Sequence, residues 1–116
     1  MSVLIVDDHP SFRAHARRLL EAEGFEVVGE APDGRQALAA AQRLKPDVVV
    51  LDVQLPDLDG FEVAARLAGS GLDSVVVLTS SRSAADYAPL LTHSPARAFI
   101  PKAELSGAVL ADLLSG

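Results

Sequence analysis

The stretch Val48-Val49-Val50-Leu51-Asp52 decides the fold of this chain, and it is followed by Val53-Gln54-Leu55-Pro56-Asp57-Leu58-Asp59-Gly60. Four consecutive apolar residues, three of them β-branched, predict a strand that is buried on both faces, which we expect to span residues 47–52. The apolar run then stops at an acid. Because open parallel α/β sheets bind their ligands outside the carboxyl ends of their strands, the pattern predicts that Asp52 lies at a functional edge.

Four further apolar segments alternate with helical patterns. Pro10 fits the first turn of a helix, and Gly24 is a good stop for it. Asp33 and Asp59 are each followed three residues later by Gln or Glu, which is the pattern of a capping box. The predicted strands are 3–6, 25–30, 47–52, 75–78 and 96–100, and the predicted helices are 10–23, 33–44, 59–68, 83–92 and 105–114.

Strands that alternate with helices of this length predict parallel βαβ units with right-handed crossovers. Since the strands are apolar throughout, helices must cover both faces of the sheet. The common order for five strands in such a doubly wound α/β sheet, (βα)5, is 2-1-3-4-5. In that order the first and third strands are neighbours at the switch point, so Asp7, Asp8 and Asp52 are expected to meet in one crevice.

Composition limits the possible functions. The chain has one domain's worth of residues, taken here as 1–116, and its hydrophobic content of 49% predicts a substantial core. The net charge of −6 argues against direct binding to nucleic acid, which requires clustered lysine and arginine. The lack of cysteine excludes disulfides and thiol chemistry and fits a cytoplasmic protein. No apolar run is long enough for a membrane span, and no signal peptide is expected, since Met1 leads directly into a strand.

Polar side chains stand at corresponding ends of four of the five predicted strands. They are Asp7-Asp8, Asp52, Thr79 and, just past the last strand, Lys102. Any one of them could simply mark the point where a strand reaches solvent. Four at the same edge of a parallel sheet are instead expected to converge on one site.

The residue types at this edge indicate a chemistry. Three close carboxylates raise each other's pKa unless a cation neutralises them, and Mg²⁺ prefers a few carboxylates together with water and phosphate oxygens. A lysine supplies a point charge for a phosphoryl group. The pattern favours phosphoryl transfer onto a carboxylate, with Asp52 as the acceptor. The histidines have no metal-ligand spacing and are expected to be structural or solvated; they are His9, His15 and His93.

With Asp7-Asp8, Asp52, Thr79 and Lys102 at the strand ends, the chain resembles the receiver domain of a bacterial two-component response regulator. Such receivers have a CheY-like, flavodoxin-like fold. The resemblance covers essentially all 116 residues. The opening motif and the segment 27–31 are most similar to receivers of regulators with a C-terminal helix-turn-helix, of the NarL/FixJ type. The matching motifs are Val6-Asp7-Asp8-His9-Pro10, Leu51-Asp52-Val53-Gln54-Leu55-Pro56 with Asp59-Gly60, Leu78-Thr79-Ser80 and Phe99-Ile100-Pro101-Lys102.

The resemblance implies a role for each acid. Asp52 would accept a phosphoryl group from a phosphohistidine on a sensor histidine kinase. Asp8 and Asp52 would coordinate Mg²⁺ directly, together with the backbone carbonyl of Gln54, and Asp7 would act through water. The domain would promote its own phosphorylation and dephosphorylation without being an enzyme in the usual sense.

The resemblance also implies a conformational switch. Lys102 would pair with the phosphoryl oxygens, Thr79 would move to hydrogen-bond the phosphoryl group, and Phe99 would turn inward behind Thr79. Taken alone, Phe99 also fits an ordinary core position. The fourth helix, fifth strand and fifth helix would form the output surface, toward an output domain or a second copy in a homodimer.

Two departures from the family pattern bear on the site. Ala103 follows Lys102 where many receivers have a proline in a cis peptide. A non-proline cis bond costs roughly 3 kcal/mol, so both a trans bond and a strained cis bond stay open. Phe99 stands where many members have tyrosine, and the outward hydrogen bond of the tyrosine hydroxyl is lost.

Other functions fit the sequence less well. A pseudo-receiver that acts as a phosphate-independent interaction module would have no physical need for buried, mutually repelling acids. Hydrolases that form an aspartyl phosphate typically have a second acid two residues after the nucleophile, where this chain has Gln54. The segment 29–34 has the glycine spacing of a P-loop, but Arg35-Gln36 follows where a lysine and a hydroxyl residue are required.

Overall fold

The structure is a computed structural model that describes residues 1–115. Within this range, strands and α-helices alternate from the amino terminus, and two short 3-10 helices precede α4 and follow β5. The elements are β1 (Ser2–Val6), α1 (Pro10–Ala22), β2 (Glu26–Ala31), α2 (Gly34–Leu44), β3 (Val48–Asp52), α3 (Gly60–Gly69), β4 (Val75–Ser80), η1 (Ala84–Tyr87), α4 (Ala88–His93), β5 (Ala98–Pro101), η2 (Lys102–Glu104) and α5 (Gly107–Ser115).

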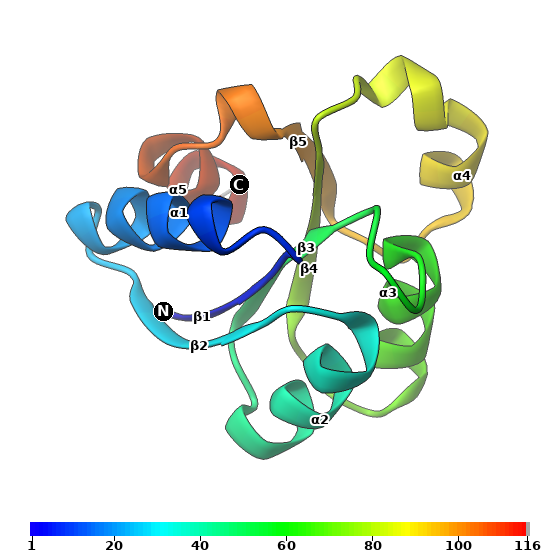
Figure 1. Cartoon of the computed structure of the whole chain (residues 1–116), viewed down its shortest axis with the longest axis horizontal. Helices are drawn as coiled ribbons and strands as arrows, with labels where there is room; N and C mark the ends of the chain where they lie inside the picture. The colour runs from blue at the N-terminus through cyan, green and yellow to red at the C-terminus, as the bar shows by residue number, and fades with distance from the viewer. Residues whose placement is uncertain (116) are drawn as a thin grey trace.

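The strands form one parallel sheet of order β2-β1-β3-β4-β5, at the centre of the molecule in Figure 1. This confirms the predicted doubly wound topology. The pairing aligns Val6 of β1 with Leu51 of β3, and Asp52 with Thr79 of β4. Because Asp7 directly follows Val6, this register brings Asp7 beside Asp52.

The side chains of β3 alternate between two apolar cores, one on each face of the sheet. Val49 and Leu51 pack in the core that α2 and α3 cover, whereas Val48 and Val50 pack in the core that α1 and α5 cover. Figure 1 shows the two pairs of helices on opposite sides of the sheet. Each of these side chains is at most 1% exposed, and burying one contributes about 2 kcal/mol. Burial on both faces explains the uninterrupted apolar run.

Carboxylates cap α2 and α3 as predicted. Asp33 accepts a hydrogen bond from the backbone N–H of Gln36 at 2.8 Å, and Asp59 accepts one from Glu62 at 2.9 Å. In both helices the reciprocal half of the capping box is replaced by another contact: the Gln36 amide donates to the Asp33 carboxylate at 3.0 Å, and the Glu62 carboxylate accepts a hydrogen bond from Arg66 at 3.2 Å. The caps nevertheless fix both helix starts where the sequence predicts them.

The predicted boundaries agree with the structure to within two residues, and one element is divided. β4 continues past its apolar run through Thr79 and Ser80, which are fully buried and pair with β5. The helix predicted over 83–92 is a 3-10 turn, η1, followed by α4. Pro89 lies in the first turn of α4, and its missing N–H prevents the helical hydrogen bonds from continuing out of η1.

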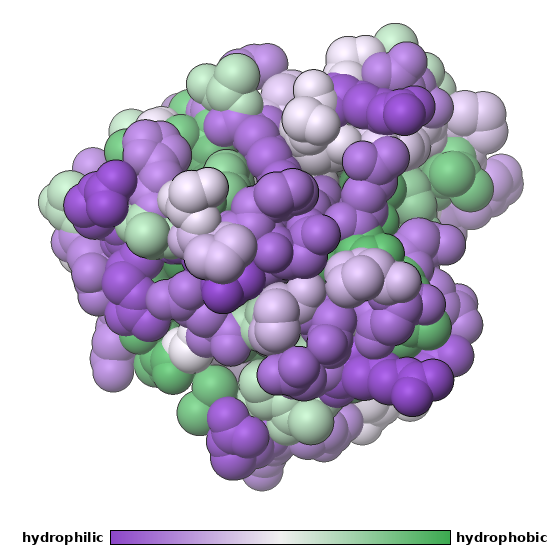
Figure 2. Space-filling view, in the orientation of Figure 1, coloured by the Kyte–Doolittle hydropathy of each residue, from purple (hydrophilic) through white to green (hydrophobic). Residues whose placement is uncertain are grey.

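The molecular surface is mainly polar on the face seen in Figure 2, where hydrophilic residues surround small, separate hydrophobic areas. Among the large apolar side chains, Met1, Leu90 and Val109 are exposed. No helix within residues 1–115 combines the length and the apolar character that a bilayer span requires.

Candidate functional site

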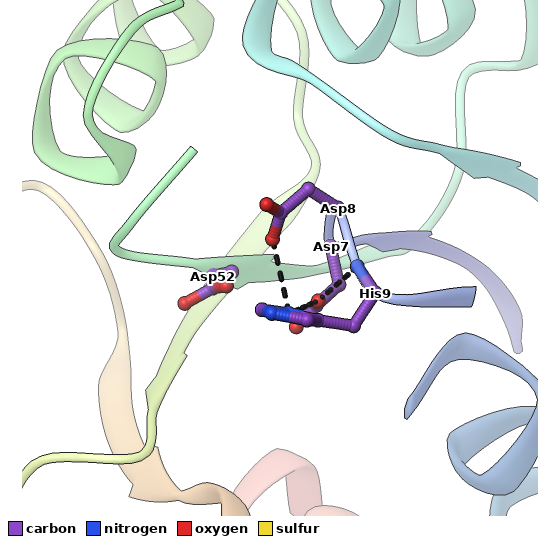
Figure 3. A group of neighbouring side chains, drawn as sticks. All are labelled: Asp7, Asp8, His9 and Asp52. Carbon is purple, nitrogen blue, oxygen red and sulfur yellow. Dashed lines mark hydrogen bonds and ion pairs between the residues drawn. The ribbon is translucent and has the colours of Figure 1, made fainter. Parts of the chain in front are cut away.

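The carboxyl edge of the sheet brings together the acids that the sequence analysis selected. Asp7 and Asp8 follow β1, and Asp52 ends β3. Figure 3 shows the side chains of Asp7, Asp8 and His9 grouped at the end of β1, beside Asp52. One ligand atom from each of these four residues lies within 4.8 Å of the others. The acids therefore meet beside the carboxyl ends of the first and third strands, as predicted.

Lys102 lies in η2, directly after β5, and its side chain extends toward these acids. Its Nζ atom lies 2.6 Å from Oδ2 of Asp7 and 3.3 Å from Oδ2 of Asp52. The ammonium also lies 4.6 Å from the centre of the Phe12 ring on α1, which is a favourable cation–π position. The lysine is thus held by contacts with three parts of the chain: the turn after β1, the end of β3 and the first turn of α1.

Burial sets the charges of this group. Burial, followed by repulsion from Asp7, raises the pKa of Asp52 to about 6. Burial also acts to raise the pKa of Asp7, but hydrogen bonds from Lys102 and His9 outweigh it and hold that pKa below its usual value. Burial acts to lower the pKa of Lys102, but its contacts with the carboxylates of Asp7 and Asp52 outweigh this effect and raise that pKa. One lysine therefore compensates Asp7 and leaves Asp52 under-compensated.

The donor set of this cluster is typical of a Mg²⁺ site. Hard divalent cations prefer oxygen ligands, and three carboxylates meet here. Asp7 and Asp52 are buried, whereas the side chain of Asp8 is 37% exposed and keeps one side of the cluster open to water. The raised pKa of Asp52 also indicates that the negative charge of the cluster is not fully compensated, so that a bound cation would be favourable.

His9 is part of the cluster, which the sequence analysis did not anticipate. Its Nδ1 atom lies 2.9 Å from Oδ1 of Asp7 and 3.0 Å from Oδ1 of Asp8. The backbone N–H of His9 also donates to Oδ1 of Asp7 at 2.8 Å. His9 is the N-cap residue of α1 and its side chain is 63% exposed, which agrees with the expected structural or solvated role; its ring contacts the two preceding acids because the turn after β1 folds it back onto them. Its position directly after two acids at a strand end was the available signal.

The other predicted site residues also lie at this edge. Thr79 is fully buried, and its hydroxyl oxygen has no hydrogen-bond partner among residues 1–115. An unpartnered hydroxyl beside Asp52 is free to donate to a group bound there. The backbone N–H of Gln54 donates to Oδ1 of Asp52 at 3.2 Å, which places the Gln54 backbone next to the acceptor. The role of the Gln54 carbonyl as a metal ligand stays a prediction.

Phe99 is half-buried and packs against Tyr87 of η1, with ring centroids 5.8 Å apart. Tyr87 in turn packs against Phe61 of α3 at 5.7 Å, and its hydroxyl lies 3.0 Å from Oγ of Ser80. Sequence reasoning missed Tyr87. The available signal was that it is the single tyrosine of the chain and lies four residues after the predicted cap, Ser83. The three rings thus connect α3, η1 and β5, and the Tyr87 hydroxyl adds a contact with the end of β4.

The peptide after Lys102 is trans, since no cis peptide bond occurs in the described part of the chain. The alternative of a strained cis bond to Ala103 is thereby excluded. A surface hollow of about 310 Å³ lies away from the acid cluster, at the amino-terminal edge of the sheet, where Asp47 and Ser74 precede β3 and β4.

Comparison with known proteins finds a matching family and similar relatives. A family model described as the response regulator receiver domain matches residues 3–113. A protein of Pseudomonas aeruginosa named as a transcriptional regulator is 44% identical over 102 residues, which cover 88% of this chain and 49% of that protein. BvgA of Bordetella pertussis, named as a positive transcription regulator of virulence factors, is 43% identical over the same shares. The chain therefore spans about half the length of these curated relatives.

The fold has close structural neighbours. The signal receiver domain of the response regulator NarL from Mycobacterium tuberculosis superposes with a TM-score of 0.85 at 36% sequence identity. The match covers 99% of this chain and 97% of the other. The neighbour is thus a receiver of the NarL type, which the opening motif of the sequence indicates.

Proposed function

The chain belongs to the response regulator receiver domain family, and on this premise we propose that it is a phosphorylation-dependent switch of a two-component system. Asp52 is the phosphoacceptor, and the donor is the phosphohistidine of a sensor histidine kinase. One observation supports this most strongly: a buried carboxylate, a lysine and an unpartnered buried hydroxyl converge at one edge of the sheet.

Mg²⁺ is the proposed cofactor. The carboxylates of Asp8 and Asp52 and the backbone carbonyl of Gln54 would hold it, with Asp7 acting through water. When bound, it would neutralise charge between the acceptor and the phosphoryl group. The close approach of the three carboxylates and the raised pKa of Asp52 support this assignment.

The transfer itself requires positioning more than covalent chemistry. A carboxylate oxygen of Asp52 attacks phosphorus, an O–P bond forms, and the N–P bond of the donor breaks. The departing imidazole nitrogen takes a proton from solvent. Lys102, which already contacts Asp52, would pair with a phosphoryl oxygen, and the Thr79 hydroxyl would donate to another. The domain promotes its own phosphorylation and dephosphorylation and turns over no separate substrate.

The output follows from the movement of Thr79. As its hydroxyl turns toward the phosphoryl group, space opens for Phe99 to rotate inward. The face formed by α4, β5 and α5 would then change and engage an output domain or a second copy. Leu90 of α4 and Val109 of α5 are 55% and 41% exposed, which supports a partner on this face. We place the domain in the cytoplasm, where sensor kinases present their phosphohistidine, and assign it no direct contact with nucleic acid or membrane.

The competing function is a pseudo-receiver that recognises partners without phosphate. Burying two carboxylates side by side destabilises a fold. We expect a chain to retain such a pair where its negative charge serves a function. The burial of Asp7 and Asp52 therefore favours the phosphoacceptor over this alternative.

Beryllofluoride, a phosphoryl mimic that binds carboxylates together with a divalent cation, separates the two functions. We expect saturable changes in the amide NMR signals of Asp52, Thr79 and Phe99 that require Mg²⁺. Asp52→Asn should remove them, whereas Asp59→Asn, which alters an exposed acid seven residues later in the sequence, should keep them. A folded wild-type chain without any such change would support the pseudo-receiver instead.

A further inference from the structure

The loop between β3 and α3, residues 53–59, begins at the proposed acceptor. It is closed at its ends by a hydrogen bond from the N–H of Gly60 to the carbonyl of Val53, at 2.7 Å. The N–H of Gln54 donates to Oδ1 of Asp52 at 3.2 Å. This loop thus contains Gln54, whose carbonyl is the one backbone ligand of the proposed metal site, and its path determines where that carbonyl lies.

The first turn of α2 is capped by two carboxylates from different parts of the chain. Asp33, next to the helix in sequence, accepts a hydrogen bond from the N–H of Gln36 at 2.8 Å. Asp57, in the loop after β3, accepts hydrogen bonds from the N–H groups of Gly34 at 2.8 Å and Arg35 at 3.0 Å. Because the first N–H groups of a helix have no partner within the helix, each carboxylate satisfies donors that the other does not.

Packing holds the same junction together. A Cβ atom added to Gly34 would lie 2.9 Å from Cβ of Leu58, so the helix start and the loop are in close contact. Asp57 also accepts a hydrogen bond from the N–H of Leu58 at 2.8 Å, which orders the loop backbone itself. The end of β2, three residues before α2, is bonded to the acid cluster, since the N–H of Asp7 donates to the carbonyl of Ala31 at 3.0 Å.

We propose that Asp57 is a positioning residue for the metal site: it fastens the loop that contains Gln54 to the start of α2. Asp57 does not touch the metal. It holds the backbone of the loop in one conformation, so that less ordering is required when the cation binds. This inference rests on the proposed Mg²⁺ site at Asp8 and Asp52.

A comparison of Asp57→Ala with Asp33→Ala tests the proposal. Each variant removes one side-chain cap from the same turn of α2, but only Asp57→Ala releases the metal-binding loop. We would titrate the ¹⁵N-labelled chain with Mg²⁺ and determine Kd from the amide signals near Asp52, with thermal unfolding measured in parallel. Loss of a residue that supports a metal ligand typically weakens metal affinity by 10–100-fold, so Asp57→Ala should raise Kd about tenfold.

The expected pattern is specific to a positioning role. Asp33→Ala should lower the thermal stability about as much as Asp57→Ala yet keep the wild-type Kd. Asp57→Asn, which retains one acceptor oxygen and supplies a second test if the alanine variant does not fold, should give an intermediate Kd. Equal Kd values for wild type and both Asp57 variants, or an equal rise in the Asp33 variant, would overturn the proposal. If the wild-type chain did not bind Mg²⁺ at all, the proposed metal site itself would be wrong.

Discussion

The Nζ atom of Lys102 lies closer to the carboxylate of Asp7, at 2.6 Å, than to that of the proposed acceptor Asp52, at 3.3 Å. The pKa values of the two acids differ accordingly: that of Asp7 is lowered, and that of Asp52 is raised to about 6. The lysine therefore compensates mainly the negative charge of Asp7, the acid that is not phosphorylated. The acid that receives the phosphoryl group is left with unbalanced charge, which a divalent cation can neutralise.

Replacement of this lysine should destabilise the metal-free fold. Lys102→Gln leaves the fully buried Asp7 carboxylate without its cation, and removing one partner of a buried ion pair costs about 3 kcal/mol. Urea unfolding at neutral pH measures the loss. Lys45→Gln, which changes the exposed lysine after α2, is the matched control and should cost much less. Equal losses for the two variants would show that the Lys102–Asp7 pair contributes little.

The raised pKa of Asp52 predicts a pH dependence. Its folded-state value of about 6 lies above the ordinary value of 3.8, so the folded chain binds more protons between these values. The contribution of Asp52 to stability must then fall as the pH rises through this window. Asp52→Asn removes the effect, and between about pH 4 and pH 7.5 it should gain on the order of 2 kcal/mol of stability relative to the wild type without Mg²⁺.

Urea unfolding of both proteins across this range checks the pH prediction, because the carboxyl groups outside the acid cluster cancel in the difference. A constant difference in the free energy of unfolding would contradict it. Adding Mg²⁺ should stabilise the wild type and reduce the difference, since the cation favours the charged form of Asp52.

The start of α3 tolerates no side chain beside the acceptor strand. A Cβ atom at Gly60 would lie 2.8 Å from Cα of Val53, and because the atoms it meets are backbone atoms of Asp52 and Val53, no side-chain rotation can relieve the clash. Gly60→Ala should therefore destabilise the fold by about 2 kcal/mol. At the other end of the same helix, Gly69 has no atom within 4 Å of the corresponding position, and Gly69→Ala should stabilise by about 0.5 kcal/mol. Thermal unfolding distinguishes the two, and a loss in both would contradict the structure.

The buried hydroxyl pair at the end of β4 should couple energetically. Tyr87→Phe keeps the ring packed between Phe61 and Phe99 but removes the hydrogen bond to Ser80, at a cost of about 1 kcal/mol. Ser80→Ala should cost more, because the N–H of Arg82 also donates to Oγ of Ser80. In a double-mutant cycle the two changes should show a coupling energy of about 1 kcal/mol, and strict additivity would show that the contact is weak.

The sequence predicted the sheet and its functional edge because both depend on patterns along the strands. The apolar run before Asp52 fits a parallel sheet covered on both faces, and parallel strands necessarily align their carboxyl ends. Thr79 and Lys102 then follow from the strand order alone. The contact between Lys102 and Asp7 was not predicted, because it depends on the path of the chain after β5.

Contacts that depend on the path of a loop could not be predicted in the same way. Asp57 caps a helix that starts 23 residues earlier, and nothing in its local sequence identifies that partner. The ring of His9 reaches two acids because of the turn that follows β1. Tyr87 finds Ser80 only once a 3-10 turn brings it back over β4. In each case the partner is set by tertiary geometry and not by spacing.

Intact-mass measurement after incubation with a small phosphodonor such as acetyl phosphate tests the central claim most directly. The wild-type chain should gain the mass of one phosphoryl group in the presence of Mg²⁺ and none when the cation is chelated. Asp52→Asn should gain none under either condition, whereas Asp59→Asn should behave as the wild type. A folded wild-type chain that gains no phosphoryl group, or an Asp52→Asn variant that gains one as readily, would contradict the assignment of Asp52 as the phosphoacceptor.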